Sequence, residues 1–496
     1  MSSGTRRDFL KFSGTAAVLA AGGAAGLAGV ASGCSRPAPP SPPGGKPDYT
    51  LRIGTGTVEL APDQIVSTVL YNGQFPGPLV RFKEGQRTWV DIYNDTGTPE
   101  QLHWHGQHVG VDVDGAAEEG TPDIPAHGMR RISFIPGPAG FRFYHTHVVP
   151  RADLSRGQYS GLVGPVFIEP KENPGRYDQE IFLTLKEFQP VFSRGGDMAA
   201  SFLAGDEDPD LNEKGESAMN ASLNRGDPHG YEVSYGAFAI NGRMLGHGDP
   251  IRVRTGQRVL LHVLNGSATE TRSLALPGHG FEVIALDGNP VPHPATVPVL
   301  WLGAAERISA IVTMTNPGVW VLGDLSDDDR GHGMGIVVEY AGQSGDPRWL
   351  PPPEFTWDYR LFAPPRPAPV APPDQTLDLL IEKRNAADSG FNVWTFNGTP
   401  FSMDGPVLDL QMNKRYRLRF RNATDDMHPM HLHRHTFEIT RFAGTPTSGV
   451  RKDVVMLGGY QTMEVDFVAD QPGLSLLHCH QQIHMDYGLM TLLKVN

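Results

Sequence analysis

The chain has 496 residues, with 58 glycines, 43 prolines and only two cysteines, and its formal net charge is −13 at pH 7. At about 150 residues per domain, this length predicts roughly three domains. The acidic balance argues against a nucleic-acid partner, and the many glycines and prolines favour a turn-rich, all-β build.

The N-terminal segment has the pattern of an export signal. Arg6-Arg7 opens a twin-arginine motif, and a Gly/Ala-rich apolar run follows over residues 15–33. This run is too weakly apolar for a stable membrane span and is typical of a signal peptide. We therefore expect residues 1–34 to direct export by the twin-arginine pathway, to the periplasm or the outer face of the cell membrane.

The two cysteines have different surroundings. Cys34 ends the apolar run in a pattern that resembles a lipoprotein cleavage site, but Ala31 replaces the stronger Leu, so lipidation and a membrane anchor stay open. Residues 35–47 form a Pro-rich linker suited to a tether. After processing, Cys479 has no cysteine with which to pair, and an unpaired cysteine in an exported protein requires another explanation. Metal ligation supplies one.

One pattern occurs three times along the mature chain. Each copy begins with an Asn-Gly turn, continues with an alternating strand, and ends with a second turn that opens with Asn. Copies spaced at domain length, with short strands and frequent turns, predict three antiparallel β-sandwiches or barrels. The first turns begin at Asn72, Asn241 and Asn397, and the second turns at Asn94, Asn265 and Asn422.

Ten of the 19 histidines gather in four short windows. On a strand, alternate side chains share a face, so each His-x-His pair would place both imidazoles together. In the last window a Cys lies between two His and would face away from them, so one strand could serve two metal sites. Two His with one thiolate are the ligands of blue-copper centres. The windows are His103-Trp104-His105, His145-Thr146-His147, His428 to His433, and His478-Cys479-His480 with His484 following.

With these four motifs in this order, the chain resembles the multicopper oxidases, the laccase-like family, over nearly its whole mature length. The resemblance implies an all-β fold of three consecutive cupredoxin-like Greek-key domains, and four coppers: one type 1, one type 2 and two type 3. The implied type 1 ligands are His428, Cys479 and His484. The implied type 2 ligands are His103 and His431. The implied type 3 ligands are His105, His145, His147, His433, His478 and His480.

The copper motifs fall in the first and third copies of the repeat only. His279 in the second copy matches His435 in the third, and we expect both to be structural. The second domain would then be a metal-free copy that spaces the other two. Its polar, acidic insert at residues 192–229 favours a solvated surface loop over a lid that recruits substrate or metal. We expect the domains at residues 48–170, 171–345 and 374–496, with a Pro-rich linker at 346–373.

The residue expected beside type 1 copper is identified by its sequence spacing from His484. In the family a Met, Leu or Phe lies five residues on, and here that residue is Leu489. We expect Leu489 to lie at the axial position without coordinating, because a slip of one residue to Met490 reverses the face. A bulge that brings in Met490 is the alternative. Loss of a thioether ligand raises the reduction potential, as in the higher-potential laccases.

Reduction of O2 to water consumes protons, so acidic residues are part of the expected site. Asp114 matches a family Asp that serves this role, although an Asp-Gly turn explains it nearly as well. A second family carboxylate is replaced here by Gln482 and Met485. Asp486 is then the nearest acid, and the second proton route stays open.

The resemblance implies a copper-dependent oxidase of a small reductant, with phenols or aromatic amines favoured and O2 as the acceptor. Electrons would pass from type 1 copper through Cys479 to His478 and His480. A rival within enzymes is oxidation of Cu(I) or another metal ion, although the 15 Met form no Met-rich insert. Rivals of other kinds are a non-enzymatic export scaffold and a two-domain copper nitrite reductase. We expect a monomer, and the sequence leaves the natural substrate open.

Overall fold

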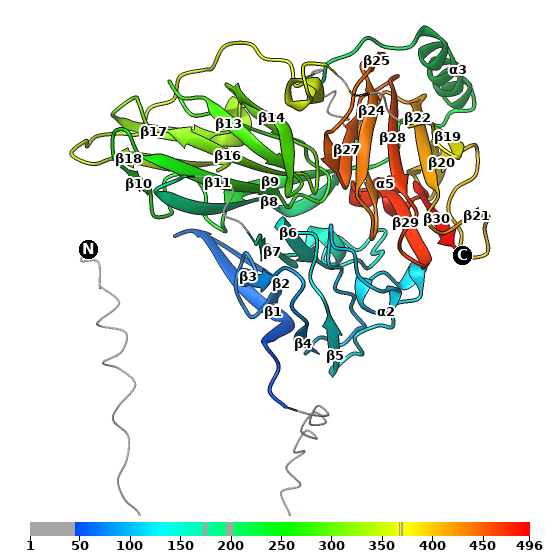
Figure 1. The fold of residues 1–496 in the computed structure, drawn as a ribbon, viewed down its shortest axis with the longest axis horizontal. Coiled ribbons are helices and arrows are strands. Elements are labelled where there is room, and N and C mark those ends of the chain that lie inside the picture. The colour runs from blue at the N-terminus through cyan, green and yellow to red at the C-terminus, as the bar shows by residue number, and fades with distance from the viewer. Residues whose placement is uncertain (1–44, 172–175, 195–201, 367, 369–370) are drawn as a thin grey trace, which may run out of the picture. The chain divides into compact units, whose positions relative to one another are not determined.

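The computed structural model describes residues 45–171, 176–194, 202–366, 368 and 371–496 (Figure 1). The twin-arginine motif, Cys34 and nearly all of the first Pro-rich segment lie outside these residues, so export, lipidation and anchoring stay predictions. Within the described ranges, no helix is both long and apolar enough to cross a membrane.

Strands dominate the described residues, as the all-β prediction requires, and they fall into three consecutive sets, used below as the three domains. The first set forms two sheets, in the orders β2-β1-β4-β5 and β3-β7-β6. Its strands are β1 (Tyr49–Ala61), β2 (Gln64–Tyr71), β3 (Val80–Lys83), β4 (Thr88–Asn94), β5 (Gly128–Phe134), β6 (Gly140–His145) and β7 (Val163–Glu169).

The second set forms a six-stranded sheet, β14-β13-β16-β11-β8-β9, a three-stranded sheet, β10-β18-β17, and the pair β12-β15. Its strands are β8 (Gln179–Ser193), β9 (Glu232–Ile240), β10 (Ile251–Val253), β11 (Arg258–Asn265), β12 (Arg272–Leu274), β13 (Phe281–Leu286), β14 (Asn289–Val297), β15 (Leu300–Leu302), β16 (Arg307–Thr313), β17 (Val319–Gly323) and β18 (Gly335–Tyr340).

The third set forms a seven-stranded sheet, β20-β19-β22-β28-β24-β25 with β26 also on β24, and a five-stranded sheet, β21-β30-β29-β23-β27. Its strands are β19 (Gln375–Asp388), β20 (Phe391–Phe396), β21 (Val407–Leu410), β22 (Arg415–Asn422), β23 (His428–Leu432), β24 (Phe437–Phe442), β25 (Thr445–Pro446), β26 (Arg451–Lys452), β27 (Val454–Leu457), β28 (Thr462–Val468), β29 (Gly473–Cys479) and β30 (Met490–Val495).

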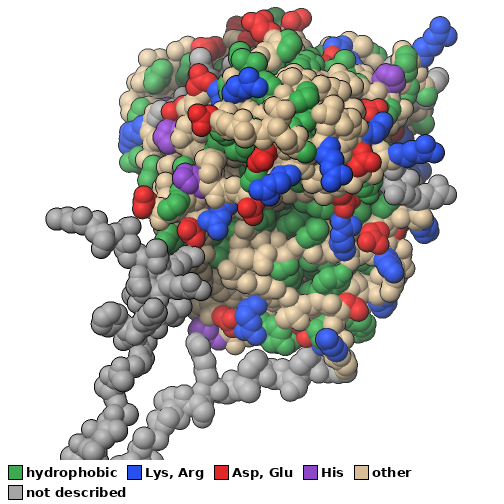
Figure 2. Space-filling view, turned by 90° about the vertical axis from the view of Figure 1, so that its left-hand side faces the viewer, with side chains coloured by type: hydrophobic (Ala, Val, Ile, Leu, Met, Phe, Trp, Pro, Cys, Tyr) green, Lys and Arg blue, Asp and Glu red, His purple; other side chains and the backbone are tan. Residues whose placement is uncertain are grey.

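Helices are few among the described residues, and all but α3 have at most five residues. The α-helices are α2 (Val111–Asp114), α3 (Pro209–Asn224), α4 (Asp327–Gly331) and α5 (Gln482–Asp486), and the 3-10 helices are η1 (Ala117–Glu119), η2 (Gly157–Tyr159) and η3 (Tyr359–Phe362). On the face in Figure 2, basic side chains are interspersed with acidic ones and gather in no single patch.

The predicted repeat is present in atomic detail. Asn72, Asn241 and Asn397 all adopt a left-handed conformation, with φ of 52°, 52° and 51°. Each side-chain oxygen accepts a backbone N–H from the first strand of its domain, at 2.6, 2.8 and 2.9 Å. Each side-chain amide also donates to a carbonyl of that strand. The three first strands then pair in parallel with β4, β11 and β22.

The segment predicted as a second Pro-rich linker is packed into the protein. Trp357, Tyr359 and Phe362 are 1%, 0% and 0% exposed and belong to one apolar cluster with residues of the second and third domains. A linker between independent domains would leave such aromatic rings in water, at a cost of a few kcal/mol each. The second and third domains therefore share a core.

The acidic insert contains a helix, so the expectation of a solvated loop is wrong for residues 209–224. Asp208 caps α3, with its carboxylate accepting the N–H of Asp210 at 3.0 Å. Leu211 is fully buried in a small apolar cluster with Ala423 and Tyr460 of the third domain. This contact packs one face of α3 against the third domain, where α3 also contacts β19. The acidic side chains of α3 are on its exposed side.

The repeated Asn turns generate a first prediction. Replacing Asn241 by Ala removes two hydrogen bonds and exchanges Asn, which tolerates positive φ, for a residue that tolerates it less well, so the free energy of unfolding should fall by about 1–3 kcal/mol. Urea unfolding of the copper-free protein measures it. Asn413 is the control, since it has φ of 62° while its side chain makes no hydrogen bond within the described residues. Equal losses for Asn241→Ala and Asn413→Ala would contradict a role for the side-chain bonds.

Candidate metal centre

Two groups of ligand-type side chains lie on opposite faces of one sheet. In the antiparallel pair β23–β29, Met430 is opposite Cys479, and His431 is opposite His478. Opposite residues share a face and successive residues alternate. His428 therefore lies on the side of Cys479, and His431 on the side of His478. The expected alternation of the His-Cys-His motif is what the structure shows.

The first group consists of three buried side chains. The Nδ1 atoms of His428 and His484 are 3.0 Å apart, and they lie 3.6 and 3.5 Å from the sulfur of Cys479. The short helix α5 follows β29 and turns the chain back, which brings His484 beside Cys479. All three side chains are at most 3% exposed. Two imidazoles and one sulfur at these distances form a three-ligand pocket.

Hydrogen bonds fix which nitrogen of His428 faces this pocket. The hydroxyl of Thr424 donates to Asn422 at 2.8 Å, so its oxygen accepts from Nε2 of His428 at 3.0 Å. Nδ1 is then the unprotonated nitrogen and points at Cys479. Burial lowers the pKa of His428 to about 4 and raises the pKa of the Cys479 thiol. A metal ion bound here must therefore displace the thiol proton, while His428 is already a free ligand.

Leu489 and Met490 lie in different apolar clusters. The carbonyl of Leu489 accepts the N–H of Cys479 at 3.0 Å, and both side chains belong to the same apolar cluster. Met490 lies opposite His478 in the β29–β30 pair and packs in another cluster with Met485. The thioether of Met490 is therefore on the face away from Cys479, and Leu489 is on its side.

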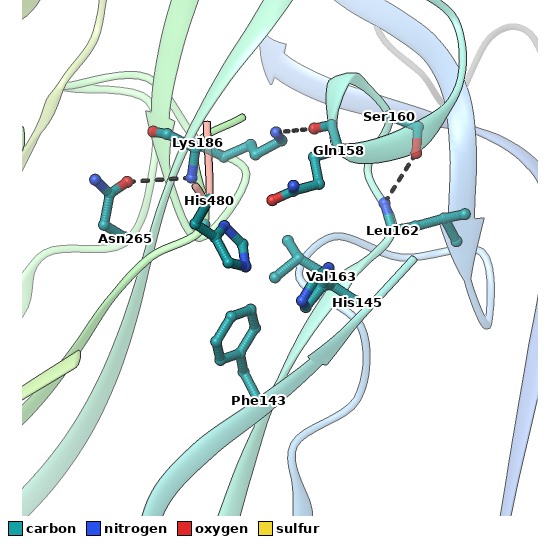
Figure 3. A pocket seen from close by; sticks show the side chains of 11 residues that line it. Phe143, His145, Gln158, Ser160, Leu162, Val163, Lys186, Asn265 and His480 are labelled. Atoms are coloured by element: carbon teal, nitrogen blue, oxygen red, sulfur yellow. Dashed lines mark hydrogen bonds between the residues drawn. The ribbon is translucent and has the colours of Figure 1, made fainter. Parts of the chain in front are cut away.

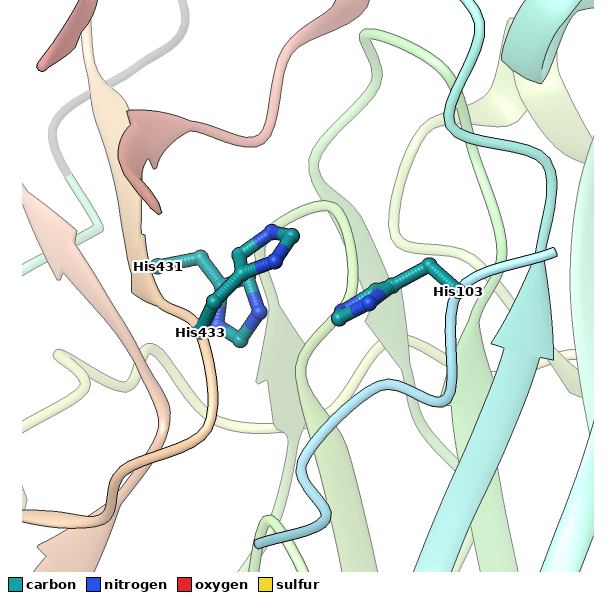
Figure 4. Close-up of side chains that lie close together, drawn as sticks. All are labelled: His103, His431 and His433. Carbon is teal, nitrogen blue, oxygen red and sulfur yellow. The ribbon is translucent and has the colours of Figure 1, made fainter. Parts of the chain in front are cut away.

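The second group consists of eight buried imidazoles from the first and third domains. Figure 4 shows His103 of the first domain facing His431 and His433 of the third. The rings of His103 and His433 stack at 4.0 Å, and those of His105 and His431 at 3.8 Å. The group comprises His103, His105, His145, His147, His431, His433, His478 and His480.

The first-domain pairs reach this group without the regular strand predicted for them. His103 joins His145 through an isolated bridge, and only His145 lies on a strand, as the last residue of β6. His105 precedes a turn at Gly106, where φ is 75°. The ring centres of His103 and His105 are nevertheless 5.4 Å apart, because the rings converge from irregular backbone.

Backbone carbonyls set the tautomers of this group. A carbonyl only accepts, so Nδ1 carries the proton in each histidine that contacts one, and Nε2 keeps its lone pair. The Nε2 atoms of His103, His145 and His431 are buried and have no hydrogen-bond partner within the described residues. The Nδ1 contacts are His103 to Asp114 (2.9 Å), His145 to Thr146 (2.7 Å), His431 to Asp453 (2.7 Å) and His478 to Cys479 (2.8 Å).

Such a group of lone pairs fits metal ions. Nε2 of His433 faces Nε2 of His478 at 3.1 Å, and both histidines carry their proton on Nδ1, since Nδ1 of His433 donates to Asp114 at 2.8 Å. Two lone pairs in contact repel unless a cation lies between them. Burial and neighbouring histidines lower the pKa of His433, His478 and His480 well below the usual value, so protons do not serve as those cations. Unprotonated imidazole suits copper.

Asp114 lies where the sequence predicts an acidic residue. Its carboxylate accepts from Nδ1 of His433 at 2.8 Å and lies 3.1 Å from Nδ1 of His103. Burial opposes the ionisation of Asp114, but its contacts with these histidines outweigh burial and hold its pKa well below the usual value. Glu119 lies 3.3 Å from His433, and burial together with the negative charge of Asp114 raises the pKa of Glu119 well above its usual value. The pair therefore holds one proton beside the cluster.

Two acidic residues at this site are absent from the sequence predictions. Glu119 follows Asp114 by five residues on η1, so an acidic pair soon after the first motif is a usable signal. Asp453 contacts His105 at 3.1 Å and stands alone in the sequence, without a motif that marks it. Asp486, the predicted alternative, instead accepts from the backbone of Arg151 and from Gln482, at 2.8 and 2.6 Å.

A small cavity lies beside the eight-histidine group (Figure 3). Phe143, His145 and His480 line one side, and the ammonium of Lys186 lies at the other, where it donates to the carbonyl of Gln158. Lys186 comes from β8, so the second domain contributes to the wall of this cavity. Both ring nitrogens of His480 are buried without a hydrogen-bond partner in the part of the chain that the structure describes.

Comparison with known proteins identifies the family. Models described as multicopper oxidase match residues 52–173, 210–339 and 371–496. The chain is 32% identical to the multicopper oxidase MmcO of Mycobacterium tuberculosis, over 86% of this chain and 83% of that protein. The chain belongs to the multicopper oxidase family. It is therefore a copper-dependent oxidoreductase that uses O2, and the rival expectations of a non-enzymatic scaffold and a two-domain nitrite reductase are wrong.

Other relatives and structures show the same architecture. Laccase-3 of Thanatephorus cucumeris is 24% identical and covers 89% of each chain. The multi-copper oxidase of Pseudomonas thermotolerans aligns with a TM-score of 0.65 at 26% identity, over 90% of this chain and 98% of that chain. Fet3p, described as a multicopper oxidase that functions in iron import, aligns at 0.73 and 18%, over 90% of each chain. The fold is three consecutive cupredoxin-like domains, as predicted.

The buried histidines generate a pH prediction for the copper-free protein. In the unfolded chain the His428 side chain has a pKa of about 6.5. In the folded protein burial lowers the pKa of His428 to about 4, so the unfolded state binds this proton first as the pH falls. The free energy of unfolding should therefore fall as pH drops through this window. In His428→Gln the fall should be smaller by about 3 kcal/mol. Urea titrations at several pH values measure it, with the exposed His332→Gln as control. Identical pH dependence in the three proteins would refute the assignment.

Proposed function

We propose that the protein is a laccase-like oxidase that removes single electrons from small phenols or aromatic amines and reduces O2 to water. The observation that carries this proposal is the pair of ligand groups on opposite faces of β29, joined by the peptide bonds of His478, Cys479 and His480. Bound copper would supply the one-electron chemistry and the reduction of O2. The chain itself would supply the path between the two sites.

We assign the ligands as follows. The mononuclear type 1 site would take His428, Cys479 and His484, whose lone pairs and sulfur already converge. A trinuclear site would take the other eight histidines, so each chain would bind four coppers. In the trinuclear site, type 2 copper would take His103 and His431, and the type 3 pair would take His105, His145, His147, His433, His478 and His480.

The electron from the reductant would arrive at His484. His428 is fully buried, whereas His484 retains 3% exposure. The ring of Trp394 packs on His484 at 4.1 Å, and its indole N–H donates to Asp426 at 2.8 Å, so this edge of the site is rigid. Leu489 at the axial position would favour a high potential, which suits phenols, since they are hard to oxidise.

Protons for the second half-reaction would come from the carboxylate pair beside the cluster. Glu119 keeps its proton because burial and Asp114 oppose its ionisation, and Asp114 contacts two cluster histidines. Asp114 would thus act next to the cluster, and Glu119 would supply the second carboxylate, which this chain lacks near its His-Cys-His motif.

A metal-ion substrate is the second candidate, and one cavity favours it. Beneath α3, near the mononuclear site, Met219, His229 and Asp425 line a pocket with Thr424, which bonds His428. Thioether, imidazole and carboxylate suit a copper ion. The ammonium of Lys383 lies in the same pocket and pairs with Asp425, so a cation would have to displace it. This competition makes the organic reductant the better-supported substrate.

The test is a metal count together with O2 consumption. We expect four coppers per chain, a blue absorption band from the sulfur of Cys479, and O2 uptake with phenols or aromatic amines faster than with Cu(I) or Fe(II). Cys479→Ser should lose one copper, the blue band and substrate-driven O2 uptake, because a hydroxyl is a poor replacement for thiolate. Cys34→Ser, the change at the other cysteine, is the control. Copper-loaded protein with at most one copper and no band would defeat the proposal.

The axial position gives a separate prediction. Leu489→Met should add a weak thioether ligand and lower the reduction potential of the blue site, while Met490→Leu should leave it unchanged, because Met490 packs on the opposite face. Redox titration of the blue band reads both variants. The reverse pattern, with Met490→Leu raising the potential strongly, would show that a thioether is already bound and would shift the preferred substrate toward metal ions.

A further inference from the structure

A buried ion pair links the second domain to the eight-histidine cluster. The guanidinium of Arg307, at the start of β16, donates to both oxygens of Asp453, with Nη1 and Nη2 each at 2.6 Å. Asp453 lies in the third domain, between β26 and β27. Both side chains are 0% exposed. A bidentate contact of this kind fixes orientation as well as charge.

Asp453 in turn contacts two cluster histidines. Its Oδ1 accepts from Nε2 of His105 at 3.1 Å, and its backbone carbonyl accepts from Nδ1 of His431 at 2.7 Å. These contacts place the proton of His105 on Nε2, so the free nitrogen of His105 is Nδ1, whereas that of His431 is Nε2. The orientation of Asp453 therefore determines which atom each of the two rings presents.

The second domain also holds the backbone of Asp453. The carboxylate of Asp287, in the β13–β14 turn, accepts the N–H of Asp453 at 3.2 Å and that of Val454 at 3.0 Å. Its Oδ1 accepts the backbone N–H of Arg307 at 2.9 Å. Arg142 of the first domain completes the set, with Nη1 at 3.0 Å from Asp453. All three domains thus converge on one carboxylate, and the second contributes both side-chain and backbone contacts.

We propose that Arg307 and Asp287 of the second domain are positioning residues for the trinuclear site, acting through Asp453 on His105 and His431. The inference rests on the proposed function and extends it, since the second domain becomes part of the metal site. Changes to residues that orient metal ligands typically cost 10- to 100-fold in metal affinity. The mononuclear site lies on the other face of β29, so it should not share this loss.

Arg307→Lys is the decisive variant, because Lys keeps the positive charge but cannot make the bidentate contact with Asp453. We expect copper affinity at the trinuclear site to fall about 10- to 100-fold, while the blue band of the Cys479 site is retained. Arg272→Lys is the matched control: Arg272 is also a fully buried arginine of the second domain, and it pairs with Asp329 at 2.7 Å, away from the cluster. Copper per chain after dialysis against a chelator, electron paramagnetic resonance and the blue band are the readouts.

The outcomes separate the inference from the proposed function. Unmodified protein that binds at most one copper would overturn both. If both the unmodified protein and Arg307→Lys retain four coppers, the inference alone is overturned. It is also overturned if Arg307→Lys and Arg272→Lys both lose the blue copper and the trinuclear coppers to the same extent. Thermal unfolding of the copper-free proteins shows whether Arg307→Lys folds. If it does not, Arg142→Lys, which removes one contact to Asp453, must show the same selective loss in milder form, and its absence would refute the positioning role.

Discussion

The two-residue period of a β-strand is the constraint on which the candidate metal centre depends. Because neighbours on β29 face opposite ways, one strand presents sulfur to one site and imidazole to the other. The pairing with β23 repeats this division, with His428 on one face and His431 on the other. A slip of one residue in this register would exchange the ligands of the two sites, so the register and the chemistry are a single property of the fold.

A second requirement is that each buried ring present a lone pair at the right atom. Strand alternation determines the face on which a ring lies, and hydrogen bonds determine which ring nitrogen carries the proton. Carbonyls accept the Nδ1 protons of His103 and His145, whereas a carboxylate accepts the Nε2 proton of His105. These bonds use groups that a protein core must satisfy in any case. The rings are thus oriented by these hydrogen bonds before a metal ion arrives, which reduces the reorganisation that binding requires.

The parts of the site that could be predicted from the sequence are those governed by local periodicity. The Asn turns repeat because each meets the same φ requirement, and the motif histidines are recognisable from their His-x-His spacing, although the first-domain pairs lie largely on irregular backbone. Asp453 has no local signal, because its partners His105 and Arg142 lie hundreds of positions away, and Glu119 is marked only by its nearness to Asp114. α3 was missed because its one buried face depends mainly on Leu211, too few apolar residues for a helical pattern. The burial of Trp357, Tyr359 and Phe362 likewise depends on a core formed by residues distant in the sequence, so their local sequence does not predict it.

The shared core explains how a metal site can lie between domains without becoming loose. The eight imidazoles of the candidate site come from the first and third domains, so any relative motion of the two domains would move these imidazoles apart. The cluster of Trp357, Tyr359 and Phe362 joins the second domain to the third, and Arg142, Arg307 and Asp453 join all three around one carboxylate. Separating these buried charges would leave each unpaired at a cost of several kcal/mol. The second copy of the repeat thus contributes buried ion pairs that hold the other two in register.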